Sequence, residues 1–168
     1  MKNLKPVIDE SNFREWFKKA QTPPGDAKPK WFKQRGYDFE KALQSMLREA
    51  KLSPRTSYKA KGEQIDGSFL YGSQVFLLEA KWHTEPLPAS EVGAFQNKVD
   101  GKLLGTLGIF LSISGYSNDA AETISRGKKI NVIMFNGSDV EASMNRNIGF
   151  VKVLQEKLRM AAEEGLIF

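Results

Sequence analysis

The stretch QIDGSFLYGSQVFLLEAKW, residues 64–82, contains two strand-like runs separated by a turn signal. Residues 64–71 and 74–82 are rich in aromatic and branched apolar side chains, as strands are. The dipeptide Gly72-Ser73 between them is typical of a two-residue hairpin turn. The sequence therefore predicts an antiparallel hairpin.

The turn fixes which residues of the hairpin lie opposite each other. If Tyr71 pairs with Gln74, the same register places Asp66 opposite Glu79, with Cβ atoms roughly 4.5–5.5 Å apart. Side chains alternate along a strand, so Lys81 emerges on the same face as Glu79. We therefore expect two carboxylates and one ammonium group to meet on one face of a sheet.

The chain around the hairpin alternates between helical and strand-like patterns. Ser11, Asp38, Ser90 and Ser117 are the expected helix caps. Helices are expected at residues 11–20, 38–51, 90–103, 117–129 and 147–164, strands at 107–114 and 130–135, a loop at 21–30 and a turn at Asn136-Gly137. The basic residues Arg126, Lys128 and Lys129 suit the end of the fourth helix.

This order predicts an α/β fold with one mixed sheet flanked by helices. The sheet should have an antiparallel hairpin start and a parallel finish. Residues 1–34 are interpreted as an N-terminal helical appendage and loop, and residues 35–168 as the main domain. The apolar tail at residues 165–168 suggests a domain excised from a longer multidomain protein.

Composition excludes several classes of function. The chain has 168 residues, no cysteine and one histidine, so disulfides and Cys/His zinc clusters are excluded. Its net charge of +5 permits a polyanionic partner without requiring one. No apolar run reaches the roughly 20 residues of a membrane helix, and no secretory signal is recognisable. We expect a cytoplasmic protein without a membrane partner.

The chemistry of the predicted cluster suits hydrolysis of a phosphodiester. Asp66 and Glu79 could hold Mg²⁺, which typically takes one or two protein carboxylates and keeps several waters. The ammonium group of Lys81 could orient the attacking water or offset developing charge. The alternative is a chance pattern, because an Asp followed later by Glu-X-Lys is common on exposed strands. The apolar neighbours of Glu79 and Lys81 favour the site.

Four blocks of sequence resemble the Mrr-like branch of the PD-(D/E)XK restriction-endonuclease-like superfamily. They are RGYDFEKALQSMLREAKL, GEQIDGSF, FLLEAKW and GIFLSISGYSNDAAE, in the order of that family. The resemblance covers roughly residues 35–135. One departure is Ile65, where the family nominally has proline before the aspartate.

The resemblance implies a set of functional residues. Asp66, Glu79 and the backbone carbonyl of Ala80 would hold the metal, Lys81 would be the catalytic lysine, and Glu40 an auxiliary acidic residue. From the residues alone, Glu40 could instead complement the dipole at the start of its helix.

Several further residues are candidates for contacts with nucleic acid. The run KPKWFKQR, residues 28–35, mixes basic and aromatic side chains, as backbone-binding patches do. It could equally be a packed aromatic pair with lysines reaching to solvent. The candidates are Lys28, Lys30, Lys33, Arg35, Gln96, Lys98 and Ser114. Solvated helix surface remains the alternative for Gln96 and Lys98, and a turn-capping hydroxyl for Ser114.

We therefore expect an endonuclease that depends on Mg²⁺ or Mn²⁺ and cuts DNA. The resemblance implies an effector of restriction or anti-phage defence, acting as a homo-oligomer or tethered to a sensor or NTPase domain. RNA remains an alternative substrate. The alternatives to this function are an inactive nucleic-acid-binding or interaction module of the same fold, and a nuclease similar to Holliday-junction resolvases.

Overall fold

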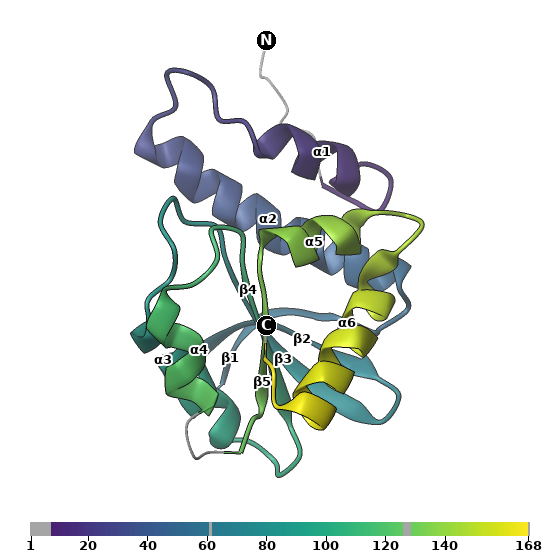
Figure 1. The fold of residues 1–168 in the computed structure, drawn as a ribbon. Helices are drawn as coiled ribbons and strands as arrows, with labels where there is room; N and C mark the ends of the chain where they lie inside the picture. The colour runs from purple at the N-terminus through teal and green to yellow at the C-terminus, as the bar shows by residue number, and fades with distance from the viewer. Residues whose placement is uncertain (1–7, 61, 126–128, 168) are drawn as a thin grey trace.

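A computed structural model describes residues 8–60, 62–125 and 129–167. Its centre is a five-stranded sheet in the order β1-β2-β3-β4-β5 (Figure 1). The strands are β1 (Arg55–Ala60), β2 (Glu63–Tyr71), β3 (Gln74–Lys81), β4 (Leu107–Ser112) and β5 (Val132–Phe135). The first three strands pair antiparallel and the last three pair parallel. The predicted mixed sheet is confirmed.

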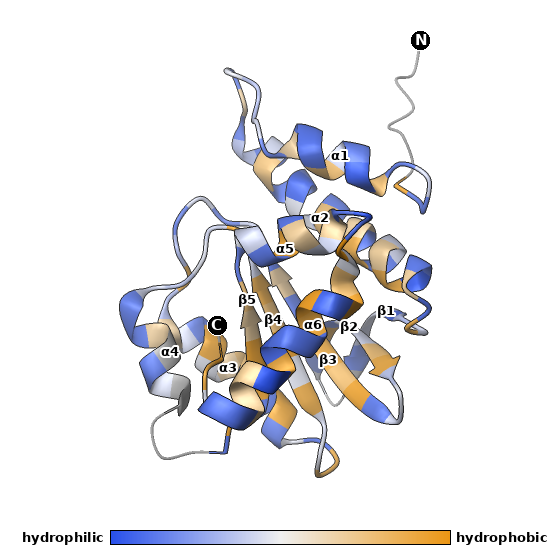
Figure 2. Ribbon diagram, turned by 45° about the vertical axis from the view of Figure 1, so that its right-hand side comes forward, coloured by the Kyte–Doolittle hydropathy of each residue, from blue (hydrophilic) through white to orange (hydrophobic). Residues whose placement is uncertain are grey.

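Helices cover both faces of this sheet. They are α1 (Phe13–Ala20), α2 (Pro29–Glu49), α3 (Ala89–Asp100), α4 (Asn118–Ser125), α5 (Gly137–Met144), α6 (Gly149–Arg159) and a π-helical turn η1 (Met160–Glu164). One apolar cluster joins the sheet to α1, α2, α5 and α6, and a second joins it to α3 and α4. Hydrophobic residues concentrate on the strands, and polar residues on the outer side of α6 (Figure 2).

The predicted register of the hairpin is confirmed. Tyr71 pairs with Gln74, and the same register leads to Gly67 opposite Leu78, where the paired region ends. Gly72 in the turn has a φ of +59°, a conformation that favours glycine. One further step in this register brings Asp66 beside Glu79.

The start of α2 was predicted wrongly. The helix begins at Pro29, not at Asp38, because proline suits the first position of a helix. The expected boundary between residues 34 and 35 falls inside this helix. Phe17 of α1 stacks on Phe39 of α2 at 6.2 Å, so the first helix packs on the same core.

The predicted caps of two helices were also wrong. Asn12, not Ser11, precedes α1, and Ser11 donates its hydroxyl to Asp9 instead. Pro88, not Ser90, precedes α3. This helix ends at Asp100, before Leu103, which is 84% exposed rather than part of a buried stripe.

Two elements were not anticipated. β1 is a polar edge strand with the sequence RTSYKA, which lacks the apolar pattern of a buried strand. The expected turn at Asn136-Gly137 is the start of α5, where Asn136 and Asp139 form a reciprocal capping box. Arg126 and Lys128, expected near the end of α4, lie outside the described residues.

The chain beyond α6 packs back onto the sheet. Ile167 is buried in the second apolar cluster, and its carbonyl accepts a hydrogen bond of 2.8 Å from the amide of Met134 in β5. The apolar character of this tail therefore has a structural reason. Within the described ranges, no helix combines the length and the apolar surface needed to cross a membrane.

Packing between α3 and β4 yields a stability prediction. A Cβ atom on Gly108 would lie 2.7 Å from Phe95 and 2.8 Å from Val99, whereas one on Gly93 of α3 would meet nothing within 4 Å. We expect Gly108→Ala to lower the free energy of unfolding by about 1–3 kcal/mol through overpacking. Gly93→Ala should raise it by about 0.5–1 kcal/mol, because it removes a glycine from a helix interior. Urea denaturation measures both, and equal stability of the two variants would contradict this packing.

Candidate active site where β2 and β3 separate

Asp66 lies where the pairing of β2 with β3 ends. Its Oδ2 accepts a hydrogen bond of 3.0 Å from the backbone amide of Ala80, and the residue is 8% exposed. Burial raises the pKa of Asp66, and the nearby carboxylate of Glu79 raises it further, while the hydrogen bond from Ala80 partly offsets both. The two carboxylates are therefore neighbours that repel each other.

Glu79 is held between two lysines. Its Oε1 lies 3.1 Å from Nζ of Lys81, and its Oε2 lies 3.0 Å from Nζ of Lys98 in α3. Lys98 also donates to the carbonyl of Gln64 at 3.1 Å. Glu79 is 7% exposed, and the two ammonium groups offset the cost of burying its carboxylate.

Lys81 remains a cation in this setting. Burial lowers the pKa of Lys81, but the carboxylates of Glu79 and Asp66 outweigh that effect, so the net shift is upward. A lysine with a raised pKa is protonated at neutral pH and cannot act as a general base. Its chemical contribution is a fixed positive charge beside the two carboxylates.

Glu40 reaches the same cluster from α2. It makes no hydrogen bond or ion pair with any residue that the structure describes. Burial and the neighbouring carboxylates of Asp66 and Glu79 raise the pKa of Glu40 to about 7, against a smaller opposing effect of Lys81. A carboxyl group with this pKa can take up or release a proton near neutral pH.

The cluster opens to solvent on two sides of Glu40. A cleft of about 560 Å³ is lined by Glu40, Ala80 and Lys81 together with Phe32 and Trp82. A second hollow, also of about 560 Å³, is lined by Glu40, Asp66 and residues of α2 and β1. A ligand in the cleft can therefore reach Lys81 and Glu40.

The four predicted catalytic residues are thus close together, while their roles stay a prediction. Asp66, Glu79 and Glu40 supply carboxylates, the donors that a hard divalent cation prefers. Across the described residues, however, no three acidic or histidine side chains are arranged to hold a metal ion. The donor chemistry fits such an ion if Glu79 yields one of the two lysines that now occupy its oxygens.

The contact of Lys98 with the catalytic cluster was not predicted from the sequence. It was a candidate for a contact with phosphate, with solvated helix surface as the alternative, and its ammonium group lies on Glu79 inside the cluster. Glu91, seven residues earlier on α3, also acts on the pKa of Lys81. Residues seven apart share one face of a helix, and that spacing could have indicated a face turned toward the site.

The other predicted nucleic-acid contacts lie in different settings. Lys28 and Lys30 line a separate hollow at the start of α2, and Lys33 lines the cleft. Arg35 is 7% exposed, packs among aromatic rings and lines the same hollow as Lys28 and Lys30. Whether any of them contacts nucleic acid stays a prediction.

Two of these candidates have structural roles. Gln96 is buried, and its amide donates to the side chain of Asn131 at 3.3 Å. Ser114 donates to the carbonyl of Glu85 at 2.8 Å and so ties down the loop after β3. Both side chains already bond within the protein, which matches the structural alternative for Ser114. Tyr116, in the last of the four sequence blocks, also has a structural contact, since its hydroxyl donates to the carbonyl of Phe110 at 2.7 Å.

Comparison with protein families identifies the chain. The family described as restriction endonuclease, with the Mrr catalytic domain (Mrr_cat), matches residues 33–144, which is more than half of the chain. This chain belongs to the Mrr restriction endonuclease family. The matched range contains all of the carboxylates and lysines of the cluster. A search of curated proteins finds no match.

Several solved structures are similar to this Mrr domain. The DNA modification-dependent restriction endonuclease AspBHI is similar with a TM-score of 0.51 and 15% identity, over 95% of this chain and 41% of AspBHI. MspJI, a restriction endonuclease in complex with a 27-mer oligonucleotide, has a TM-score of 0.46 and 14% identity, over 99% of this chain and 40% of MspJI. The protein of unknown function AF1548 has a TM-score of 0.42 and 15% identity, over 75% of this chain and 76% of AF1548. The Mrr domain thus spans about two fifths of AspBHI.

The raised pKa of Glu40 predicts how stability depends on pH. The folded protein keeps this proton up to about pH 7, whereas the unfolded chain loses it near its ordinary value, so stability falls as pH rises between the two. Glu40→Gln removes this dependence. Its stability relative to wild type should rise by about 1 kcal/mol from about pH 5 to about pH 8, after allowance for solvent screening.

Urea denaturation at each pH measures this difference. Glu156→Gln, an exposed position on α6, is the control and should show no such trend. A constant difference between Glu40→Gln and wild type at all pH values would contradict the assigned environment of Glu40.

Proposed function

We propose that this protein is a metal-dependent endonuclease that hydrolyses phosphodiester bonds of DNA. The observation that carries the proposal is the meeting of Asp66, Glu79, Lys81 and Glu40 where β2 and β3 separate, beside an open cleft. Membership of the restriction endonuclease family supports both the reaction and DNA as substrate.

In this proposal, Asp66, Glu79 and the carbonyl of Ala80 hold Mg²⁺ or Mn²⁺. When bound, such an ion polarises a phosphoryl oxygen and lowers the pKa of a bound water. The repulsion between Asp66 and Glu79 supports the assignment, because a divalent cation relieves it. The other oxygen of Asp66 bonds to none of the described residues, so it is open to an ion. Glu79 would exchange one of its lysine partners for the ion.

The protein's own groups divide the remaining work. Water attacks phosphorus, and the bond from phosphorus to the leaving oxygen breaks. Lys81 carries a fixed positive charge in the cleft, which stabilises the negative charge that builds on the phosphoryl oxygens. Glu40, with its pKa of about 7, accepts the proton from the attacking water when it is ionised.

We further propose the setting of this activity. Membership of the restriction endonuclease family supports a cytoplasmic role in restriction or anti-phage defence. The chain spans about two fifths of AspBHI and MspJI. The proposal includes assembly as a homo-oligomer, or attachment to a sensor or NTPase domain.

Substitutions at the cluster should separate metal binding from chemistry. Asp66→Ala and Glu79→Ala each remove a ligand, so both should lose Mn²⁺ binding and DNA cleavage together. Lys81→Ala should still bind Mn²⁺ while the rate of cleavage falls by about 10²-fold or more. Calorimetric titration and single-turnover cleavage of plasmid DNA measure the two properties, and EDTA should abolish cleavage by the wild type.

The proposal fails if oligomeric wild-type protein leaves supercoiled, linear and single-stranded DNA intact with either metal. It also fails in its division of roles if Lys81→Ala loses Mn²⁺ binding as completely as Asp66→Ala. All three variants should remain folded, which circular dichroism checks.

Lys98 should compete with the metal for Glu79. Its ammonium group occupies Oε2 of that carboxylate, so a divalent cation must displace it or share the oxygen. We expect Lys98→Met to bind Mn²⁺ about 10-fold more tightly, the equivalent of ~1.4 kcal/mol, because one competing charge is gone.

The matched control is Lys102→Met on the same helix, since Lys102 pairs with Glu63 rather than Glu79. It removes the same charge without freeing the site. Equal Mn²⁺ affinities of the two variants, measured by calorimetry without DNA, would show that Lys98 does not compete.

A further inference from the structure

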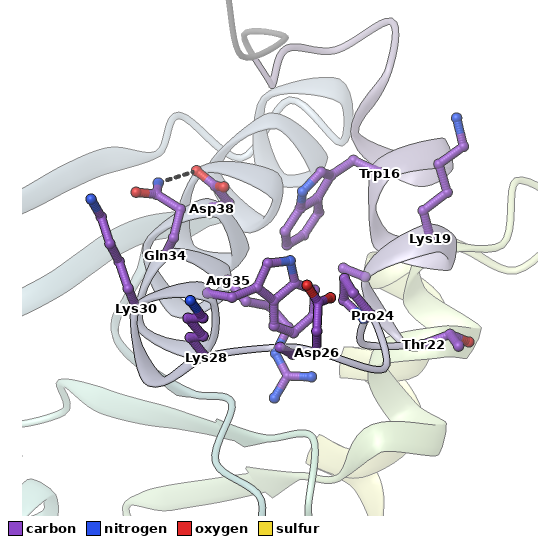
Figure 3. Close-up of a pocket in the computed structure, with 13 residues that line it drawn as sticks. Trp16, Lys19, Thr22, Pro24, Asp26, Lys28, Lys30, Gln34, Arg35 and Asp38 are labelled. Carbon is purple, nitrogen blue, oxygen red and sulfur yellow. Dashed lines mark hydrogen bonds between the residues drawn. The ribbon is translucent and has the colours of Figure 1, made fainter. Parts of the chain in front are cut away.

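A hollow distinct from the catalytic cleft lies between α1, the loop that follows it and the start of α2 (Figure 3). Its volume is about 660 Å³, within the range of roughly 300–1,000 Å³ that small-ligand sites occupy. In Figure 3, Trp16 points from α1 toward the centre of the hollow, while Pro24 and Asp26 border it from the loop. The hollow is large enough for a ligand, and nothing assigned so far uses it.

Aromatic side chains form part of its walls. Trp16 and Trp31 both line the hollow, and both are only partly buried. Trp16 also packs edge-on against Trp82, and Trp31 edge-on against Phe32, with ring centroids 6.0 Å and 5.2 Å apart. Indole rings fixed in this way offer a planar ligand a surface on which to stack.

Arg35 adds a positive charge that has no acceptor. The guanidinium carbon lies 4.4 Å from the ring centroid of Trp82 and 5.1 Å from those of Trp31 and Phe32. Its Nε is buried without a hydrogen-bond partner, and no described residue forms an ion pair with the guanidinium. A buried charge without a counter-charge is costly, and an anionic ligand in the hollow would supply one.

The start of α2 has the same preference for an anion. The helix has no acidic residue in its first turn and no side-chain cap, and Lys28 and Lys30 lie at its first positions. The positive end of the helix dipole and these lysines therefore act together at the rim of the hollow. Two acidic side chains line the hollow. Asp38 already accepts from Gln34 and lies near Lys41, and Asp26 is outnumbered by Lys28, Lys30 and Arg35.

The hollow and the cleft share one wall. Arg35 lines the hollow, whereas its ring partners Phe32 and Trp82 line the cleft that holds Lys81. Trp31 and Glu40 are nine residues apart on α2, or about 13 Å along the helix axis. A DNA strand covers that distance in about four nucleotides, at ~3.4 Å each in a duplex.

We propose that this hollow binds one unpaired nucleotide of the strand that is cut in the neighbouring cleft, with its base against Trp31 and Trp16 and its phosphate near Arg35, Lys28 and Lys30. A planar ring joined to an anion matches the aromatic walls and the unpaired charge together. The nucleotide must be unpaired because a stacked base exposes no face to a pocket. This inference rests on the proposed nuclease function.

The test measures binding of the full chain to a fluorescently labelled single strand and to its duplex, in EDTA so that no cleavage occurs. The single strand is also prepared with one abasic site at each position in turn. In the wild type, one abasic position should weaken binding by about 10-fold, as loss of a stacked base does. Trp31→Ala should weaken binding of the intact strand by a similar factor and be insensitive to that abasic site, whereas Trp31→Phe should keep most of the affinity.

Two controls make the result specific. Leu104→Ala truncates an exposed apolar side chain elsewhere and should bind as the wild type does. If Trp31→Ala fails to fold, the double variant Lys28→Gln and Lys30→Gln decides instead, because both lysines are exposed. It should lose affinity and lower the salt dependence of binding by about two units of slope.

The proposal would be overturned if abasic sites at all positions had the same effect on binding. Unchanged binding by folded Trp31→Ala would also overturn it. A third contrary result is tight binding of free dAMP that depends on Trp31, with no abasic position affecting binding of the strand. That result would indicate a mononucleotide ligand. Cleavage of the duplex with Mn²⁺ tests the nuclease function separately. If the protein cleaves the duplex but no abasic position weakens binding, only the proposed nucleotide site is refuted. If one abasic position weakens binding but no DNA is cleaved, only the proposed nuclease function is refuted.

Discussion

The pairing of β2 with β3 is the constraint on which the rest of the site depends. The two strands follow one register from the turn to Gly67 and Leu78, and the amide of Ala80, two residues further along β3, donates to the side chain of Asp66. The carboxylate thereby takes a place in the hydrogen bonding of the sheet. This contact holds Asp66 beside Glu79, at the ends of the two strands where the cleft lies.

Charge balance explains why so many ionisable groups can share a buried region. Glu79 has a lysine on each of its oxygens, and those lysines come from different elements, β3 and α3. Among the described residues, neither Asp66 nor Glu40 has a lysine on its carboxylate, and burial together with the neighbouring carboxylates raises the pKa of each. The site therefore contains one carboxylate that two lysines balance, and two carboxylates whose ionised forms a cation would stabilise.

The helix α2 links the catalytic cluster to the surface around it. One of its faces carries Glu40 into the cleft, and another carries Trp31 and Arg35 toward the separate hollow. The helix is held in place by α1, whose Phe17 packs on Phe39 and Trp82. The N-terminal segment thus supports the wall that both hollows share.

The sequence by itself determined the hairpin, its register, the mixed sheet and the closeness of Asp66, Glu79 and Lys81. These features depend on a two-residue turn and on the alternation of side chains along strands, which are local properties. It did not determine where α2 begins, the polar edge strand β1, or α5. In those segments, contacts with distant parts of the chain outweigh local patterns.

Only the tertiary structure decided the contact of Lys98 with Glu79, the raised pKa of Glu40 and the burial of Arg35 among three rings. Each depends on how a helix packs against strands far from it in sequence, and on how much water that packing excludes. Distances and desolvation of this kind are set by the whole fold, so no local pattern encodes them.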